Sequence, residues 1–139
     1  MSDPARFPPL INPFLQTEGF WYLASPYTHY ADGIEAAFHE ACRNAGLLIR
    51  AGIPVFSPIA HSHPVARFGG IDPLDHAIWL PADLPMMQAA RGLIVCRMAG
   101  WENSYGVAVE MEHFARWGRP IHPMTPGEIP AALLKEKKT

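Results

Sequence analysis

The sequence has few cysteines, little net charge and no long apolar run, and each scarcity argues against a class of protein. Two cysteines, Cys42 and Cys96, occur among 139 residues, and two unclustered cysteines form neither a disulfide framework nor a zinc site. The formal net charge of −2 argues against a protein that coats nucleic acid. No stretch approaches the roughly 18 apolar residues of a membrane span, and the first residues lack the basic-then-apolar order of a signal peptide. We therefore expect a cytoplasmic protein whose partner is neither a nucleic acid polymer nor a membrane.

The apolar content is high enough for a substantial core. Nearly half of the residues (49%) are hydrophobic, while 15 prolines are many for this length. A chain of this size suits one domain. The expected organisation has three parts: a proline-rich N-terminal arm (1–18), a single domain (19–130) and a charged C-terminal tail (131–139).

Strand and helix patterns alternate along the chain. Short apolar runs predict strands, and apolar residues spaced by three or four predict helices. The strands are expected at 20–24, 53–56, 92–97 and 120–123, and the helices at 34–51, 83–90 and 104–117. This order favours an α/β, three-layer Rossmann/flavodoxin-like domain with a parallel sheet of four to five strands.

Two details of this reading depend on local signals. Asp32 followed three residues later by Glu35 has the form of a capping box, with Asp32 as the N-cap of the first helix. Residues 57–80 are rich in His, Pro, Gly and Asp, and they are expected to form a long loop. Long loops inside compact domains are often functional.

The most informative stretch is residues 100–110, which leaves a buried strand and enters a helix. At 100° per residue, Glu110 lies at the edge of the apolar stripe of that helix. Glu112 and Arg116 lie on the far face at i,i+4 and are expected to form a solvated pair. Ser104 and the free N–H groups of the first turn make a natural anion site. Because ligands bind beyond the carboxyl ends of parallel strands, Glu110 is a candidate catalytic carboxylate.

Several elements occur in an order that matches a known group of enzymes. Tyr22 lies in the first strand before the small-residue turn Ser25-Pro26, and Asp83-Leu84 starts the helix before the third strand. Gly106 precedes Glu110 by four residues, and Gly118 and Pro120 follow it. Over residues 20–123 the chain resembles the nucleoside 2-deoxyribosyltransferase-like superfamily.

The resemblance implies hydrolysis or transfer at an N-glycosidic bond without a cofactor. It would make Glu110 the nucleophile at C1′, with Tyr22 orienting it and Asp83 helping to protonate the leaving base. Homo-oligomers are usual in the superfamily. Nucleoside-specific members carry Asp where this chain has Ser104. A serine there is similar to the nucleoside 5′-monophosphate N-glycosidase branch, although uncharacterised member families share this form.

The remaining candidates have two readings each. Gly106, Ser25, Tyr27, His61 and Trp101 are predicted to bind substrate, and His63 could take the place of His61. Trp79 and Trp101 could stack on a base or cover the core. Glu110 could be an ordinary boundary carboxylate, Asp83 a helix cap and Tyr22 a core aromatic. A further group of residues could build a metal site, although no metal is expected. Its members are His61, His63, Asp72, Asp75 and His76.

A second class of function stays open beside the enzyme. The same pocket could belong to a binding module that holds a nucleotide or a nucleotide-derived ligand without turning it over. A phosphate-transfer enzyme is less favoured, because the chain has no Gly-x-x-x-x-Gly-Lys-Ser/Thr loop.

Overall fold

A four-stranded parallel sheet organises the chain. The computed structural model describes residues 18–138, so most of the expected N-terminal arm lies outside the described residues. The strands are β1 (Trp21–Ala24), β2 (Val55–Phe56), β3 (Gly92–Cys96) and β4 (Ile121–Met124). All pairings are parallel and the order is β2-β1-β3-β4. The predicted α/β fold class is confirmed, with four strands.

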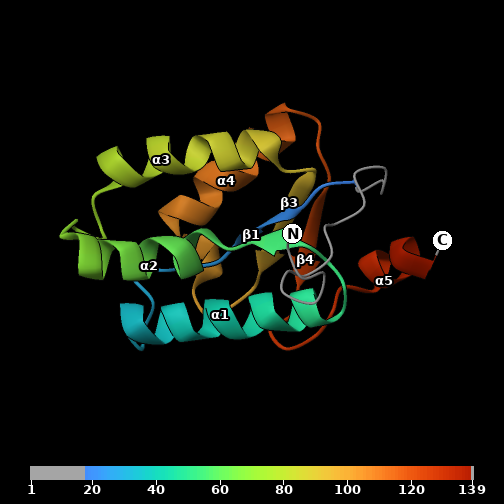
Figure 1. The fold of residues 1–139 in the computed structure, drawn as a ribbon, viewed down its shortest axis with the longest axis horizontal. Coiled ribbons are helices and arrows are strands. Elements are labelled where there is room, and N and C mark those ends of the chain that lie inside the picture. Colours follow the sequence, from blue (N-terminus) through green and yellow to red (C-terminus); the bar gives the residue numbers. More distant parts are fainter. Residues whose placement is uncertain (1–17, 139) are drawn as a thin grey trace, which may run out of the picture.

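Helices cover both faces of the sheet (Figure 1). They are α1 (Ile34–Arg50), α2 (Pro58–Gly69), α3 (His76–Ala89), α4 (Tyr105–Arg116) and α5 (Ala131–Lys138), with a short 3-10 turn η2 (Trp101–Asn103) before α4. Figure 1 shows the strands between α1 on one side and α3 with α4 on the other. None of the helices within residues 18–138 is both long and apolar enough to cross a membrane.

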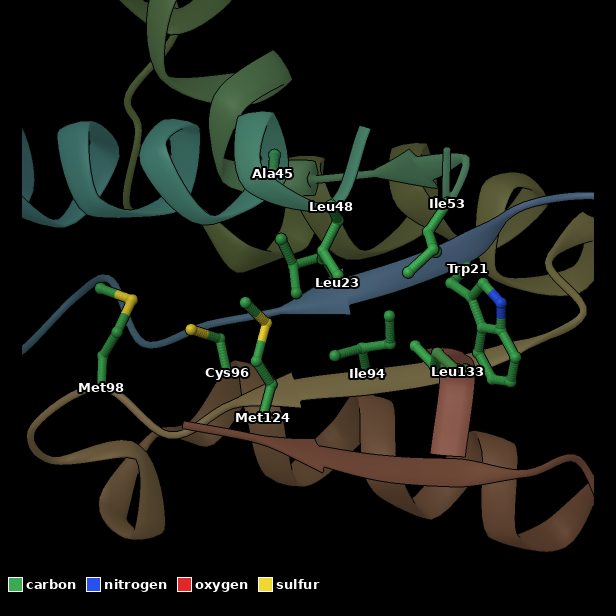
Figure 2. Close-up of a cluster of buried hydrophobic side chains, with 10 residues drawn as sticks. All are labelled: Trp21, Leu23, Ala45, Leu48, Ile53, Ile94, Cys96, Met98, Met124 and Leu133. Carbon is green, nitrogen blue, oxygen red and sulfur yellow. The ribbon is translucent and has the colours of Figure 1, made fainter. Parts of the chain in front are cut away.

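The side chains of β1 alternate between two cores. Trp21 and Leu23 belong to one buried cluster with Leu48 and Ile94. Figure 2 shows Leu23 beside Leu48 of α1 and Trp21 beside Leu133 of α5. Tyr22 and Ala24 point to the opposite face and join a cluster from α3, β3 and α4, with members Met87, Ala90, Leu93, Val95, Val107 and Phe114. Because strands buried on both faces are apolar throughout, β1 and β3 were readily predicted from the sequence.

The prediction of a loop at 57–80 is wrong, because this segment contains α2 and the beginning of α3. Ser57 is the N-cap of α2 and its hydroxyl accepts a hydrogen bond from the N–H of Ala60 at 3.2 Å. Pro58 occupies the first turn, where a missing N–H costs nothing. Asp75 caps α3 by accepting from the N–H of Ala77 at 3.1 Å. Asp83 therefore lies inside α3, and the reading of Asp83 as a helix cap is also wrong.

One further local expectation differs from the structure. The N-cap of α1 is Gly33, with φ +93° and no side-chain cap, so the capping box of Asp32 and Glu35 does not form. Residues 131–138, within the expected charged tail, form helix α5. The cap at Ser104 and the exposed pair of Glu112 with Arg116, at 2.6 Å, are confirmed.

Candidate functional site

A pocket of about 310 Å³ opens beyond the carboxyl ends of β1 and β3. Residues 25–30 after β1 and residues 99–106 after β3 form two of its walls, and α2 and α3 supply the rest. Loops at this edge diverge from neighbouring strands, so a cavity forms between them. The polar side chains among its lining residues are those of Ser25, Tyr27, Thr28, His29, Tyr30, Ser62, His76, Trp79, Asp83, Asn103, Ser104, Tyr105 and Glu110.

Glu110 is a buried carboxyl in the second turn of α4. Glu110 is only 7% exposed, although it lines the pocket. The pKa of Glu110 is raised to about 8, mainly by burial; the hydrogen-bonding interaction with Tyr22 opposes this rise, and the charge of Asp83 adds to it. Burial also raises the pKa of Asp83, which lines the pocket from α3, to about 6. The site therefore holds two coupled carboxyls that titrate near neutral pH.

Tyr22 lies beneath this pair, on the buried face of β1. Its hydroxyl has no hydrogen-bond partner of normal geometry within the described residues. Burial first, and then the charges of Glu110 and Asp83, raise its pKa far above the ordinary range. The hydroxyl also stabilises the ionised form of Glu110. The hydroxyl is therefore a neutral group close to Glu110 that stops short of a hydrogen bond of normal geometry.

Ser104 and Ser25 line the pocket from the segments that follow β3 and β1. The hydroxyl of Ser104 accepts from the N–H of Val107 at 3.3 Å, as an N-cap does, and its own proton is left to donate. Ser25 is 5% exposed, and its hydroxyl has no partner within the described part of the chain. An unpaired buried hydroxyl costs free energy, so a ligand that bonds to Ser25 would remove that cost.

Tyr27 connects the pocket to a hydrogen-bonded group outside it. The Tyr27 hydroxyl lies 2.6 Å from Nδ1 of His63, and Nε2 of His63 lies 2.8 Å from Oε2 of Glu35. His63 is buried and its ring stacks on Phe38, with 4.4 Å between centroids. Burial and the charge of Glu35 raise the pKa of Tyr27 to about 12.

A family of known proteins matches most of the chain. Its description is a domain of unknown function, DUF1937, and it covers residues 19–125. The chain belongs to this family. No curated protein matches the sequence. The DUF1937 domain contains every pocket residue from Ser25 to Glu110, and its description names no activity, so the chemistry must be argued from the geometry.

The DUF1937 domain brings most of the predicted residues together. Six of them line one pocket: Ser25, Tyr27, Asp83, Ser104, Gly106 and Glu110. A Cβ added at Gly106 would meet no atom within 4 Å, so the space beside this glycine is open to a ligand. Tyr22 lies behind the lining, close enough to Glu110 to influence its titration.

Two predicted substrate contacts do not reach the pocket. The ring of His61 lies near Phe56, at 5.7 Å between centroids, and Trp101 lies beneath the guanidinium of Arg97 at 5.1 Å. Trp79 is instead the tryptophan that lines the pocket, and its Nε1 donates to the carbonyl of Asp72 at 2.9 Å.

Sequence reasoning did not predict that His29 and His76 line the pocket, and it considered His76 only as a metal ligand. The ring of His76 lies 5.2 Å, between centroids, from that of Tyr105, another lining residue. The cap at Asp75 could have placed His76 in a first helical turn, but His29 carries no comparable signal. No group of three or more metal-ligating side chains occurs among residues 18–138.

Proposed function

We propose that the pocket binds a nucleoside or a nucleoside 5′-monophosphate and cleaves or transfers its N-glycosidic bond. The observation that carries the proposal is the pair of carboxyls, Glu110 and Asp83, which share one cavity. Their pKa values are near 8 and 6, so the form with Glu110 ionised and Asp83 protonated is the minor one at neutral pH. Glycosidic chemistry needs one carboxylate and one carboxylic acid. The resemblance to nucleoside 2-deoxyribosyltransferase-like enzymes supports the same assignment.

In the first step, the Glu110 carboxylate attacks C1′ of the sugar. The electron pair of the C1′–N bond moves to the base nitrogen, and Asp83 supplies the proton that neutralises it. In the second step, water or a second base attacks C1′, gives its proton to the Asp83 carboxylate, and displaces the Glu110 carboxylate from C1′. Tyr22 supports this role, because its interaction favours the ionised form of Glu110.

The position of the 5′ group follows from the N-terminus of α4. Ser104 and the free N–H groups of the first turn can donate to a phosphate or to a 5′-hydroxyl. The described lining includes no lysine or arginine. A phosphate would therefore be held by neutral donors and by His29 or His76, and a nucleoside is an equally good fit by charge.

Base release tests the proposed function. The protein is incubated with a panel of ribo- and deoxyribonucleosides and their 5′-monophosphates, and free base is followed by chromatography. Release that is lost in Glu110→Ala and retained in Glu112→Gln, an exposed carboxylate of the same helix, supports it. Release from monophosphates alone supports a phosphate role for Ser104, and release from nucleosides alone refutes that role. No release by a protein that binds these ligands contradicts the enzymatic assignment.

One observation favours a binding module as the second candidate. A carboxyl with a pKa of about 8 is mostly protonated at pH 7, and a neutral carboxylic acid donates a hydrogen bond but does not attack carbon. In that case Glu110 would recognise a ligand acceptor. Glu110→Gln, which keeps a donor, would then retain binding, and wild type would release no base.

A further inference from the structure

Tyr27, His63 and Glu35 form a chain of hydrogen bonds that runs from the pocket to the surface. Tyr27 lines the pocket, whereas Glu35 and His63 line a separate surface hollow with Arg67. The three residues come from the segment after β1, from α2 and from α1. The buried His63 ring is thus the link between an enclosed site and a carboxyl that is 53% exposed.

The direction of each hydrogen bond follows from the Glu35 carboxyl. Its hydrogen bond with His63, followed by the charges around it, lowers the pKa of Glu35, so this group is an ionised acceptor. Nε2 of His63 must then carry the proton and donate it. In a neutral imidazole, Nδ1 is left as an acceptor, and the Tyr27 hydroxyl donates its proton to Nδ1. In an imidazolium, Nδ1 donates to the oxygen of Tyr27, and the Tyr27 O–H can then donate to another acceptor.

We propose that the charge of His63 sets the hydrogen-bonding polarity of Tyr27 toward the pocket, with Glu35 and His63 as positioning residues. With neutral His63, Tyr27 offers only its oxygen and favours a ligand group that donates, such as a sugar hydroxyl or an amino group. With protonated His63, Tyr27 can donate and favours an acceptor, such as a carbonyl or a phosphate oxygen. The identity of these ligands rests on the proposed function.

The surroundings of His63 hold its ring in one orientation. Phe38 of α1 stacks on it, and Tyr27 contacts its edge at 5.7 Å between centroids. The charged and titratable groups near its Glu35 partner are His39 of α1, at 3.6 Å, and Arg67 of α2, at 3.8 Å. These two groups pair with Glu35, whereas the hydrogen-bond partner of Tyr27 is His63. A change of charge therefore reaches Tyr27 through His63.

The first measurement needs no ligand. Nitrogen-15 spectra of the imidazole rings are recorded across the titration of His63, whose signals are assigned by their loss in His63→Gln. We expect the neutral ring to carry its proton on Nε2, and Tyr27→Phe to shift the Nδ1 resonance while the backbone spectrum is preserved. A neutral ring protonated on Nδ1 would overturn the proposal, because Tyr27 could then not reverse its polarity.

The second measurement is the affinity for a panel of nucleosides and their 5′-monophosphates by calorimetry, at a pH on each side of that titration. Asp83 and Glu110 also titrate in this pocket, so the affinity of every variant changes with pH. The change in wild type should differ by roughly 2- to 10-fold, the effect of one hydrogen bond, from the change in Tyr27→Phe and in His63→Gln. It should equal the change in His39→Gln, the matched control. A pH dependence of Tyr27→Phe identical to that of wild type would overturn the proposal. If no member of the panel binds, the proposed function fails, and the spectra alone decide the polarity.

Discussion

Asp83 on α3 and Glu110 on α4 lie close enough for the charge of Asp83 to raise the pKa of Glu110. Both carboxyls line the pocket, and the charges of both raise the pKa of the buried Tyr22 hydroxyl. Charging either group disfavours charging the other, so protons leave the pair in two coupled steps.

This coupling predicts a bell-shaped dependence of activity on pH. The proposed mechanism needs Glu110 ionised and Asp83 protonated, and the pKa values are about 8 and about 6. At pH 7 about a tenth of each group is in the required form, so about one molecule in a hundred is competent. We expect kcat/KM to fall on both sides of an optimum near pH 7, measured by base release. A profile that stays flat from pH 5 to pH 9 would contradict the assignment of both groups.

Asp83→Asn should lower the pKa of Glu110. The substitution removes the neighbouring charge and leaves burial nearly unchanged, so the carboxyl of Glu110 should titrate below about 8. Carbon-13 spectra of the Glu110 carboxyl give this value directly. The same variant should lose about 10²- to 10⁴-fold in turnover if Asp83 is the acid. An unchanged titration of Glu110 would show that the two carboxyls are not coupled.

Glu110→Gln should stabilise the fold at alkaline pH while it abolishes turnover. Because the pKa of Glu110 is raised from 4.5 to about 8, the native state binds more protons than the unfolded state between these values, and its stability falls as pH rises through them. A shift of this size corresponds to about 5 kcal/mol once the group is ionised. Urea unfolding at pH 5 and pH 9 measures the difference.

The substitution Glu110→Gln should increase the free energy of unfolding by different amounts at the two pH values. The increase should be small at pH 5 and reach several kcal/mol at pH 9, and Glu112→Gln on the exposed face should show no such trend. If Glu110→Gln changed the free energy of unfolding equally at both pH values, ionisation of the Glu110 carboxyl would not destabilise the folded protein.

The sequence predicts the sheet and helices α1 and α4 well, and it predicts helices α2 and α3 poorly. Strands β1 and β3 are continuous apolar runs because both of their faces are buried. Helix α3 was largely missed because Pro81 and Pro85 lie inside it. An interior proline costs about 3 kcal/mol or more in an isolated helix. Packing of Trp79 and Met87, both buried, outweighs this cost, and local propensity does not contain that information.

The candidate site divides in the same way. Ser104, Gly106 and Glu110 belong to one helix, so helical spacing alone relates them. Tyr27 and His63 are 36 positions apart and meet only after β1 and α2 are packed, so no local pattern indicates their contact. Trp101 belongs to the informative stretch, but its ring lies against the guanidinium of Arg97 and does not line the pocket.

Arg119→Ala should destabilise the helix that carries Asp83. Nη1 of Arg119 donates to the carbonyl oxygens of Met87, Gln88 and Ala90, at 3.2, 2.6 and 2.9 Å, and so caps the C-terminal end of α3. Loss of these charge-assisted bonds should lower the free energy of unfolding by about 1–3 kcal/mol. Arg116→Ala, which breaks an exposed pair with Glu112, should cost about 0.5 kcal/mol or less. Equal losses in urea unfolding would refute the capping role.

Gly92→Ala should be the most damaging of the conservative substitutions in the sheet. A Cβ at Gly92 would collide with the ring of Trp21 and would lie 2.8 Å from the carbonyl oxygen of Pro120. Both neighbours are fixed, since Trp21 is buried in the core beside β3 and Pro120 accepts the hydrogen bond of Leu93. Overpacking of this kind costs about 1–3 kcal/mol. Gly46→Ala, on the exposed side of α1 with no atom within 4 Å of its Cβ, should instead stabilise the protein by about 0.5–1 kcal/mol. Thermal unfolding of the two variants should therefore shift in opposite directions, and a shift of Gly92→Ala to higher temperature would contradict the packing of Trp21 against β3.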